Sequence, residues 1–375
     1  MTEPTTDLFD GLVARTLDTP RIAVRVIERA SDDPATPAER TLVLLHGLLS
    51  SSLIWQPFME DLPSDLRVVA VDLRGFGGTE GLPVDATRGV ADFAEDVAAA
   101  LDALEVPTAH LVGWDLGATV AIALARLRPA LSLTLLAPFS PFGLGGTRRD
   151  GTRLTDDDAG CGAATANPEF VRRLNDRDSG TDSAASPRSV FRSEFVASGY
   201  TSSDEDVWIH AMLTTSTAPG NYPGEVVSSP NWPGTAAGAT GVLNALAPRY
   251  LDADALASLD PKPPVLWVRG SLDAIVADGS FLDPNHLGAL GIAPDWPGAD
   301  VAPAQPMIAQ LTDAFAAYAA SGGTVQDVVL EGVGHTPHLE RPSVVRRAIL
   351  EAIGYIGAAQ NPAPPTEAII LRSAD

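Results

Sequence analysis

Two hydrophobic patterns alternate along the first 140 residues. Residues 21–29 alternate apolar and polar with a period of two, which predicts an edge strand. Continuous apolar runs predict strands buried on both faces, and apolar residues at helical spacing predict amphipathic helices. The expected buried strands are residues 41–47, 66–75, 109–115 and 131–140, and the expected helices are residues 89–104 and 116–128.

The pattern changes after Ser140. Residues 141–258 are rich in Gly, Ser, Thr, Asp and Pro and show only short helical patches, such as 204–213. Regular order returns with a strand at 263–276, is interrupted by a second irregular stretch at 278–306, and then resumes. The last expected elements are a helix at 307–320, a strand at 324–332 and a helix at 343–356.

This order predicts an α/β fold with a mostly parallel central sheet and helices on both faces. An insertion that leaves from the carboxyl end of a parallel strand covers the edge where ligands bind, so we expect the irregular stretch to form a cap. The expected divisions are an N-terminal core part (1–140), the cap (141–258), a C-terminal core part (259–357) and a loosely attached tail (358–375).

Chemistry-bearing residues stand where the predicted strands end. They are the segment His46–Trp55, the turn Gly113–Gly117 with Asp115 at its tip, Asp273, and His335. Each has a plain structural explanation, such as a helix N-cap for Asp115 or a turn for Asp273. Together they stand in the chain order oxyanion loop, turn nucleophile, acid, histidine.

With the turn Asp72–Thr79 (DLRGFGGT), these motifs resemble the α/β-hydrolase family over residues 21–356. The resemblance implies a sharp elbow in which Gly113 and Gly117 leave room at the strand–helix junction. It also implies an oxyanion hole formed by the backbone N–H groups of Leu48 and Leu116.

The tip of the elbow departs from the common family pattern G-x-S-x-G, because Asp115 stands in place of serine. Attack by a carboxylate on an ester carbonyl gives an anhydride, which is more reactive than the starting ester. Attack on a saturated carbon gives a stable alkyl ester instead, which His335, oriented by Asp273, can hydrolyse by activating water. This division of labour resembles the epoxide hydrolases and haloalkane dehalogenases, and predicts an epoxide-hydrolase-like enzyme.

The residues around the elbow give mixed signals. Leu116 follows Asp115 where dehalogenases often have tryptophan, and Leu49 stands where epoxide hydrolases usually have the proline of H-G-x-P. Tyr200 and Tyr222 in the cap are candidate acids for the leaving oxygen, with cap packing as the alternative. The other candidate pocket residues are Trp55, Trp114, Trp208 and Trp232.

Two other functions stay open. The segment HGLLSSSLIW looks more like esterases, lactonases and C–C hydrolases, so the chain is alternatively a serine-type hydrolase whose elbow serine is replaced by Asp115, inactive or impaired. A third possibility is a non-catalytic α/β-hydrolase fold that binds a small apolar ligand. His338 competes with His335 for the role of base, but the pattern G-x-G-H favours His335.

Composition narrows the partners. The 48 acidic and 25 basic residues give a net charge of −23, which disfavours nucleic acid and anionic membranes. Cys161 is the only cysteine, so no internal disulfide and no cysteine zinc site is expected. We expect no metal or organic cofactor, no signal peptide and no membrane span. The prediction is a cytoplasmic, bacterial monomer or homodimer that acts on a small apolar substrate.

Overall fold

A nine-stranded sheet forms the centre of the computed structural model, which describes residues 8–31, 38–356 and 369–372. Across the sheet, the strands are β1 (Val13–Asp18), β2 (Ala23–Arg29), β4 (Arg67–Val71), β3 (Thr41–Leu45), β5 (Ala109–Trp114), β6 (Ala130–Leu136), β9 (Val265–Gly270), β10 (Val325–Leu330) and β11 (Ile369–Arg372).

The strands from β4 to β10 run parallel, and β1, β2 and β11 add antiparallel pairings at the two sides. Every residue of β3 and β5 is buried, as expected for apolar strands covered on both faces. Because parallel strands end at one edge of the sheet, the loops after β3, β5, β9 and β10 meet there.

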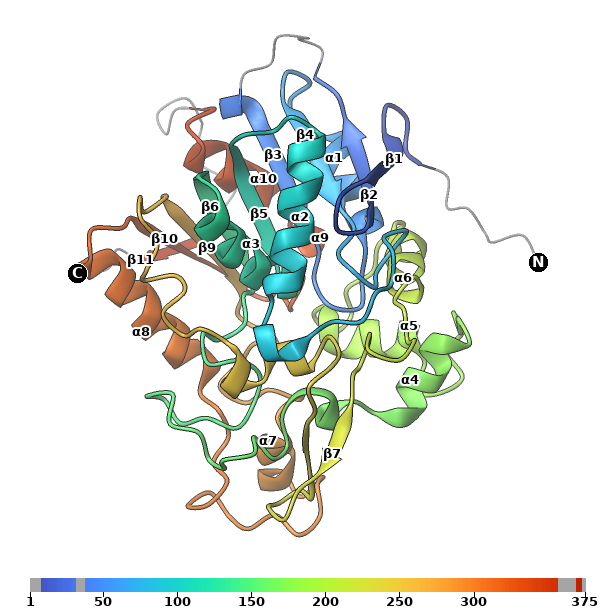
Figure 1. Cartoon of the computed structure of the whole chain (residues 1–375), viewed down its shortest axis with the longest axis vertical. Coiled ribbons are helices and arrows are strands. Elements are labelled where there is room, and N and C mark those ends of the chain that lie inside the picture. Colours follow the sequence, from blue (N-terminus) through green and yellow to red (C-terminus); the bar gives the residue numbers. More distant parts are fainter. Residues whose placement is uncertain (1–7, 32–37, 357–368, 373–375) are drawn as a thin grey trace.

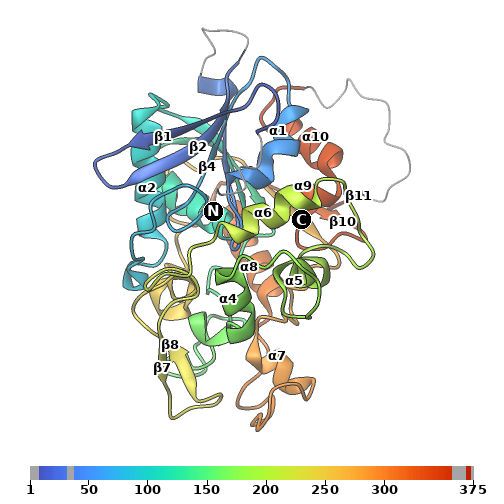
Figure 2. The same cartoon turned by 90° about the vertical axis from the view of Figure 1, so that its right-hand side faces the viewer.

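Helices cover both faces of this sheet (Figure 2). The helices α2 (Ala91–Ala103) and α3 (Leu116–Leu127) lie on one face, and α1 (Gln56–Glu60) and α10 (Pro342–Ala352) lie on the other. The helix α8 (Met307–Ala320) packs on β9, where the rings of Phe315 and Trp267 lie 4.7 Å apart. These layers confirm the predicted α/β architecture.

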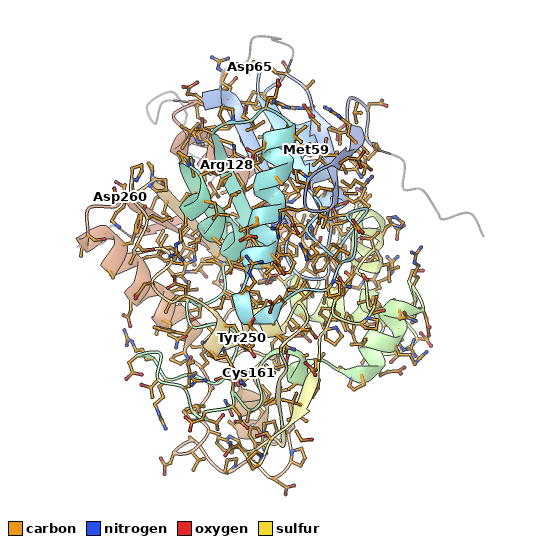
Figure 3. The ribbon with its side chains drawn as sticks, in the orientation of Figure 1. Met59, Asp65, Arg128, Cys161, Tyr250 and Asp260 are labelled. Atoms are coloured by element: carbon orange, nitrogen blue, oxygen red, sulfur yellow. The ribbon has the colours of Figure 1, made fainter. Side chains whose placement is uncertain are left out.

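The cap fills the lower half of the molecule in Figure 1. Its helices are short, and its only strands in the described part of the chain form one small pair. The elements are α4 (Pro168–Asn175), α5 (Pro187–Val190), a single π-helical turn (Phe191–Phe195), α6 (Glu205–Leu213), β7 (Val226–Ser228) and β8 (Thr235–Ala237). Figure 3 places Cys161 and Tyr250 in this half and Met59 and Arg128 in the half that holds the sheet.

The structure differs from the sequence prediction in three places. The edge of the sheet is β1 and not β2, because the largely exposed segment Val13–Asp18 pairs outside β2. Residues 278–306, assigned to the core, lie beside the cap with α7 (Pro284–Ala289). Within the predicted tail, β11 pairs with β10, while residues 358–368 and 373–375 lie outside the described residues.

Candidate active site

Asp115 stands at a strained turn between β5 and α3. Its backbone angles are φ 54° and ψ −119°, a region that residues other than glycine rarely occupy and that is often found at functional sites. The turn is too tight for side chains on either side. A Cβ atom at Gly113 would lie 2.3 Å from the carbonyl oxygen of Gly117, and one at Gly117 would lie 2.2 Å from that of Leu45.

Three acidic and basic side chains meet at this turn. The Nε2 atom of His335 lies 3.1 Å from Oδ1 of Asp115, and its Nδ1 atom lies 2.9 Å from Oδ2 of Asp273. Asp273 itself is fixed by accepting the N–H groups of Ile275 and Val276. The structure therefore brings together the three side chains that the sequence predicts as catalytic; their roles remain predictions.

The charge state of His335 follows from this geometry. Burial alone would lower the pKa of His335, but the neighbouring carboxylates of Asp273 and Asp115 outweigh burial and raise the pKa from 6.5 to about 10. At neutral pH, His335 is thus an imidazolium held between two carboxylates. In this state it cannot accept a proton, so it becomes a base only when one of those negative charges is removed.

One of the two predicted oxyanion-hole donors makes a hydrogen bond to Asp115 in the structure. The backbone N–H of Leu48 donates a hydrogen bond to Oδ2 of Asp115 at 2.6 Å. Gly47 permits this approach, since a Cβ atom there would lie 2.7 Å from that of Asp115. Leu116 begins α3 directly after the elbow, and the role of its N–H group as a donor remains a prediction.

The loop after β3, which carries the N–H group of Leu48, is held in place by residues of the motifs His46–Trp55 and Asp72–Thr79. The Nε2 atom of His46 accepts the N–H of Leu73 at 3.0 Å. Asp72 accepts the N–H groups of Ser52 at 2.6 Å and Gly78 at 2.8 Å. Burial lowers the pKa of His46, so it stays neutral and serves as a structural acceptor.

A cavity of about 610 Å³ opens above Asp115, a size that suits a small-molecule ligand. Its walls come from the cap and from the second irregular stretch, and its floor comes from the loop after β3 and the elbow. The lining residues are Leu48, Leu49, Asp115, Thr165, Ala166, Asn167, Glu169, Phe170, Ser183, Ala184, Ala185, Val190, Ser193, Glu194, Phe195, Tyr222, Leu243, Ile275, Phe281, Leu282 and Leu287.

The two candidate cap tyrosines lie in different places. Tyr222 lines the cavity, is 6% exposed, and its hydroxyl has no hydrogen-bond partner within the described part of the chain. Burial raises the pKa of Tyr222 well above its usual value. Tyr200 does not line the cavity, because its hydroxyl donates to the carbonyl of Leu339 at 2.7 Å. Tyr222 is therefore the candidate acid that remains.

The four predicted pocket tryptophans do not line the cavity either, and each has another role. Trp55 and Trp114 are fully buried beneath the site. Trp208 is 3% exposed and packs within the cap. Trp232 donates its indole N–H to the carbonyl of Pro294 at 2.9 Å. The contacts of these four tryptophans are thus with neighbouring side chains and backbone, and a role in substrate binding stays a prediction.

Sequence reasoning missed the apolar walls of the cavity. The sequence signal was weak and consisted of two pairs of apolar residues spaced four apart, Phe170 with Leu174 and Phe191 with Phe195. The missed wall residues include Phe170, Phe195, Leu243, Ile275 and Phe281.

The two histidines of the last loop have opposite environments. Both His335 and His338 are buried, but neither ring nitrogen of His338 has a hydrogen-bond partner among the described residues. The His338 ring packs against Trp55 and Trp114, with centroids 4.5 and 5.0 Å apart. Burial lowers the pKa of His338 well below its usual value, so it stays neutral. This difference supports His335 as the candidate base.

Within residues 8–31, 38–356 and 369–372, no group of three or more His, Cys, Asp or Glu side chains is arranged to hold a metal ion. In the same residues, no helix has the length and apolar character to cross a membrane.

Comparison with known proteins identifies the architecture. Residues 40–158 match the family model described as the alpha/beta hydrolase fold. An esterase from Exiguobacterium antarcticum superposes with a TM-score of 0.55 at 14% identity, over 91% of this chain and 100% of that one. The chain has the α/β-hydrolase fold.

Sequence relatives match only part of this fold. A Variovorax paradoxus protein, RutD, whose name gives carbamate hydrolysis as an inferred activity, is 41% identical over 102 residues. That match covers 27% of this chain and 38% of RutD. A pimeloyl-[acyl-carrier protein] methyl ester esterase of Aliivibrio salmonicida is 41% identical over 88 residues, covering 24% and 31% of the two chains. The chain thus matches less than two fifths of the length of these curated relatives.

Proposed function

We propose that the chain is a hydrolase that acts through a covalent alkyl ester on Asp115 and opens epoxides of uncharged, apolar compounds. One observation carries this proposal. A carboxylate occupies the elbow with one oxygen on the N–H of Leu48 and the other on His335, which Asp273 holds from behind. This arrangement suits a nucleophile that needs no base to activate it.

In the first step, a carboxylate oxygen of Asp115 forms a bond to an epoxide carbon as the ring C–O bond breaks. The ring oxygen takes the proton of the hydroxyl of Tyr222, a residue of the cavity lining. Because burial disfavours the tyrosinate, Tyr222 regains a proton, which the imidazolium of His335 supplies through solvent in the cavity. The step ends with neutral His335 and an ester on Asp115.

Alkylation itself prepares the second step. The ester carries no charge, so one of the two carboxylates that raise the pKa of His335 is gone. Neutral His335 takes a proton from water, whose oxygen attacks Cγ of Asp115 while the N–H of Leu48 holds the oxyanion. Collapse breaks the acyl C–O bond, and the departing alkoxide takes the second water proton. The products are a diol, the Asp115 carboxylate and the His335 imidazolium.

The ionisable residues that line the cavity limit the class of substrate that we propose. Its ionisable acidic lining residues are Asp115, Glu169 and Glu194, and no arginine, lysine or histidine is among the residues that line it. A substrate with its own carboxylate or phosphate would find no cation among the lining residues themselves. The cations nearby are already paired, Arg172 and Arg173 with Glu169 and His335 with Asp115. The remaining walls are mainly aliphatic and aromatic, which favours an uncharged apolar substrate.

The relatives support a second candidate function. Their names describe ester and carbamate hydrolysis, and the loop after β3 is closer to esterases than to epoxide hydrolases. On this alternative, the chain descends from a serine-type ester hydrolase whose elbow serine became Asp115. Such a protein would retain the site geometry but open no epoxide.

Mass spectrometry of the Asp115 peptide separates the two. The protein is incubated with panels of uncharged epoxides, haloalkanes and esters, quenched in acid and digested. A substrate-sized mass increase on Asp115 with an epoxide supports the proposal. If no compound labels Asp115 and the variant Asp115→Ser hydrolyses esters, the replaced-serine alternative is correct. Ligand-induced stabilisation without labelling or turnover by either protein would indicate a binding protein.

A further inference from the structure

A third carboxylate lies next to the triad of Asp115, His335 and Asp273 without belonging to it. Glu340 is 5% exposed and stands five residues after His335. Its Oε1 atom accepts the N–H of Gly334 at 2.9 Å, and its Oε2 atom accepts the N–H of Ala197 at 2.9 Å. The hydroxyl of Thr336 lies 3.2 Å from Oε1. Glu340 thus binds both residues that flank His335, and also the cap.

The residues Phe195–Ala197 form a cap wall that follows the π-helical turn and contributes Phe195 to the cavity. Two further contacts join this part of the cap to the segment that follows His335. The hydroxyl of Thr336 lies 3.2 Å from the carbonyl of Phe195, and that of Tyr200 donates to the carbonyl of Leu339 at 2.7 Å. The cap wall and the histidine loop are therefore joined at several points.

Packing leaves little freedom between these two segments. The rings of Phe195 and His335 meet edge to face with centroids 5.8 Å apart. A Cβ atom at Gly334 would lie 2.7 Å from the backbone nitrogen of Ala197. On the other side, the indole N–H of Trp114 donates to the carbonyl of His335 at 2.9 Å. A shift of the cap wall therefore moves His335 relative to the elbow.

From these contacts we infer that Glu340 is a positioning residue. It keeps the His335 ring within hydrogen-bond distance of Asp115 only while the cap wall keeps its contacts with Glu340 and Thr336. This inference rests on the proposed function for its kinetic consequence. Alkylation uses Asp115 as nucleophile and Tyr222 as acid, and needs His335 only as a proton source through solvent, whereas hydrolysis of the ester needs His335 within reach of both a water and Cγ of Asp115. Loss of the Glu340 contacts should therefore slow the second step more than the first.

The variant Glu340→Gln tests this with little change in shape. A carboxylate accepts hydrogen bonds on both oxygens, whereas an amide presents one oxygen and one NH₂ group. The NH₂ group would face either the N–H of Gly334 or that of Ala197, so one of the two bonds is lost. The matched control is Glu331→Gln, an exposed glutamate in the same loop region.

Single-turnover kinetics with an epoxide that labels Asp115 gives the first readout. For Glu340→Gln, we expect hydrolysis of the ester to slow by about 10- to 100-fold, so that the adduct accumulates. Its formation should change by less than about threefold, and Glu331→Gln should match the parent in both steps. Equal loss in both steps, or no loss in either at unchanged thermal stability, would overturn the positioning role.

A second readout does not depend on turnover. The proton shared by Nδ1 of His335 and Asp273 gives a low-field ¹H NMR signal, assigned by its absence in His335→Gln. We expect Glu340→Gln to shift or broaden this signal and Glu331→Gln to leave it unchanged. If no compound labels Asp115 in the parent, the proposed function fails, and this signal still decides whether Glu340 positions His335. An unchanged signal in Glu340→Gln contradicts the inference.

If Glu340→Gln does not fold, the double variant Thr336→Val with Tyr200→Phe takes its place. It removes the two neighbouring hydrogen bonds to the carbonyls of Phe195 and Leu339 and leaves the Glu340 carboxylate in place. Accumulation of the adduct and a shifted imidazole signal are again expected. If this double variant matches the parent in single-turnover kinetics and in the ¹H NMR signal, the hydrogen bonds between the cap and the segment of His335 do not position His335.

Discussion

The sheet half and the cap half of the molecule are ordered by different means. In the sheet half, apolar strands fix Asp115, Asp273 and His335 at one edge, and each follows a parallel strand. The cap has few regular elements, and buried polar contacts join its irregular segments in addition to apolar packing. Asp158, for example, is fully buried and accepts ion pairs from Arg153 at 3.0 Å and Arg249 at 2.8 Å.

This difference suggests that the two halves divide the work. The reacting groups lie on the more regular half, which suits chemistry that tolerates little displacement. The cap provides the walls of the cavity and one candidate acid, and therefore decides what reaches Asp115. Changes in the sheet half should abolish the reaction, whereas changes in the cap should alter its rate or selectivity.

The largest effect is expected for Asp115→Asn. An amide is a poor nucleophile, so turnover of an epoxide should fall on the order of 10³-fold or more, without labelling of the elbow peptide. Product formation and peptide mass measure this, and circular dichroism checks that the fold is retained. Substantial turnover by this variant would remove Asp115 from the reaction.

The next effect concerns the second step. His335→Gln leaves the nucleophile in place but removes the base, so the ester on Asp115 should form and persist. Quenched samples should show close to one label per chain, while multiple turnovers fall by about 10² to 10⁴-fold. A variant that turns over normally would separate His335 from ester hydrolysis, whereas one that forms no label would show that His335 is already required in the first step.

In the cap, Tyr222→Phe should have a smaller effect that is confined to the first step. Loss of the hydroxyl removes the proton donor for the ring oxygen, so kcat/KM for epoxides should fall by about 10²-fold, while hydrolysis of a preformed ester changes little. Tyr250→Phe, in the same insertion but outside the lining of this cavity, is the control. If kcat/KM changes equally in Tyr222→Phe and Tyr250→Phe, Tyr222 is not the acid of the first step.

The protonation of His335 as a function of pH tests the ion pairs within the sheet half. Because the folded-state pKa of His335 is raised from 6.5 to about 10, its charge stabilises the fold fully below about pH 6.5, and this stabilisation is lost as the pH rises towards 10. NMR titration should place the imidazole midpoint near 10 in the parent and clearly lower in Asp273→Asn. A midpoint that Asp273→Asn leaves unchanged would contradict the ion-pair description.

The smallest effect is expected at His338. Its ring nitrogens have no hydrogen-bond partners among the described residues, so an apolar ring of similar shape removes a desolvation cost. His338→Phe should leave kcat within about twofold and raise the free energy of unfolding by about 1 kcal/mol or leave it unchanged. Chemical denaturation measures this, and strong destabilisation would indicate that His338 has a polar partner after all.

Much of the sheet half could be predicted from the sequence, for a physical reason. Strands such as β3 and β5 are buried on both faces and so appear as unbroken apolar runs. Glycines mark the elbow because no side chain fits there. By contrast, β1 was missed because most of its residues are exposed, and its sequence VARTLD is not continuously apolar.

The cap could not be predicted to the same depth. Its order comes from contacts between residues far apart in the chain, such as Ala163 with Asn244 and Asp158 with Arg249, and these leave no periodic signal. The position of Tyr222 in the cavity wall and the displacement of Tyr200 to Leu339 likewise depend on how such contacts fold the insertion.

The cavity walls come from two separate insertions, one after β6 and one after β9. Neither contains Asp115 or His335, and Asp273 lies before the second irregular stretch, 278–306. Side-chain changes in the walls of either insertion can therefore reshape the cavity while Asp115, Asp273 and His335 stay on the sheet. Libraries confined to the walls at Phe170, Leu243 and Phe281 offer a direct route to enzymes with new substrate ranges.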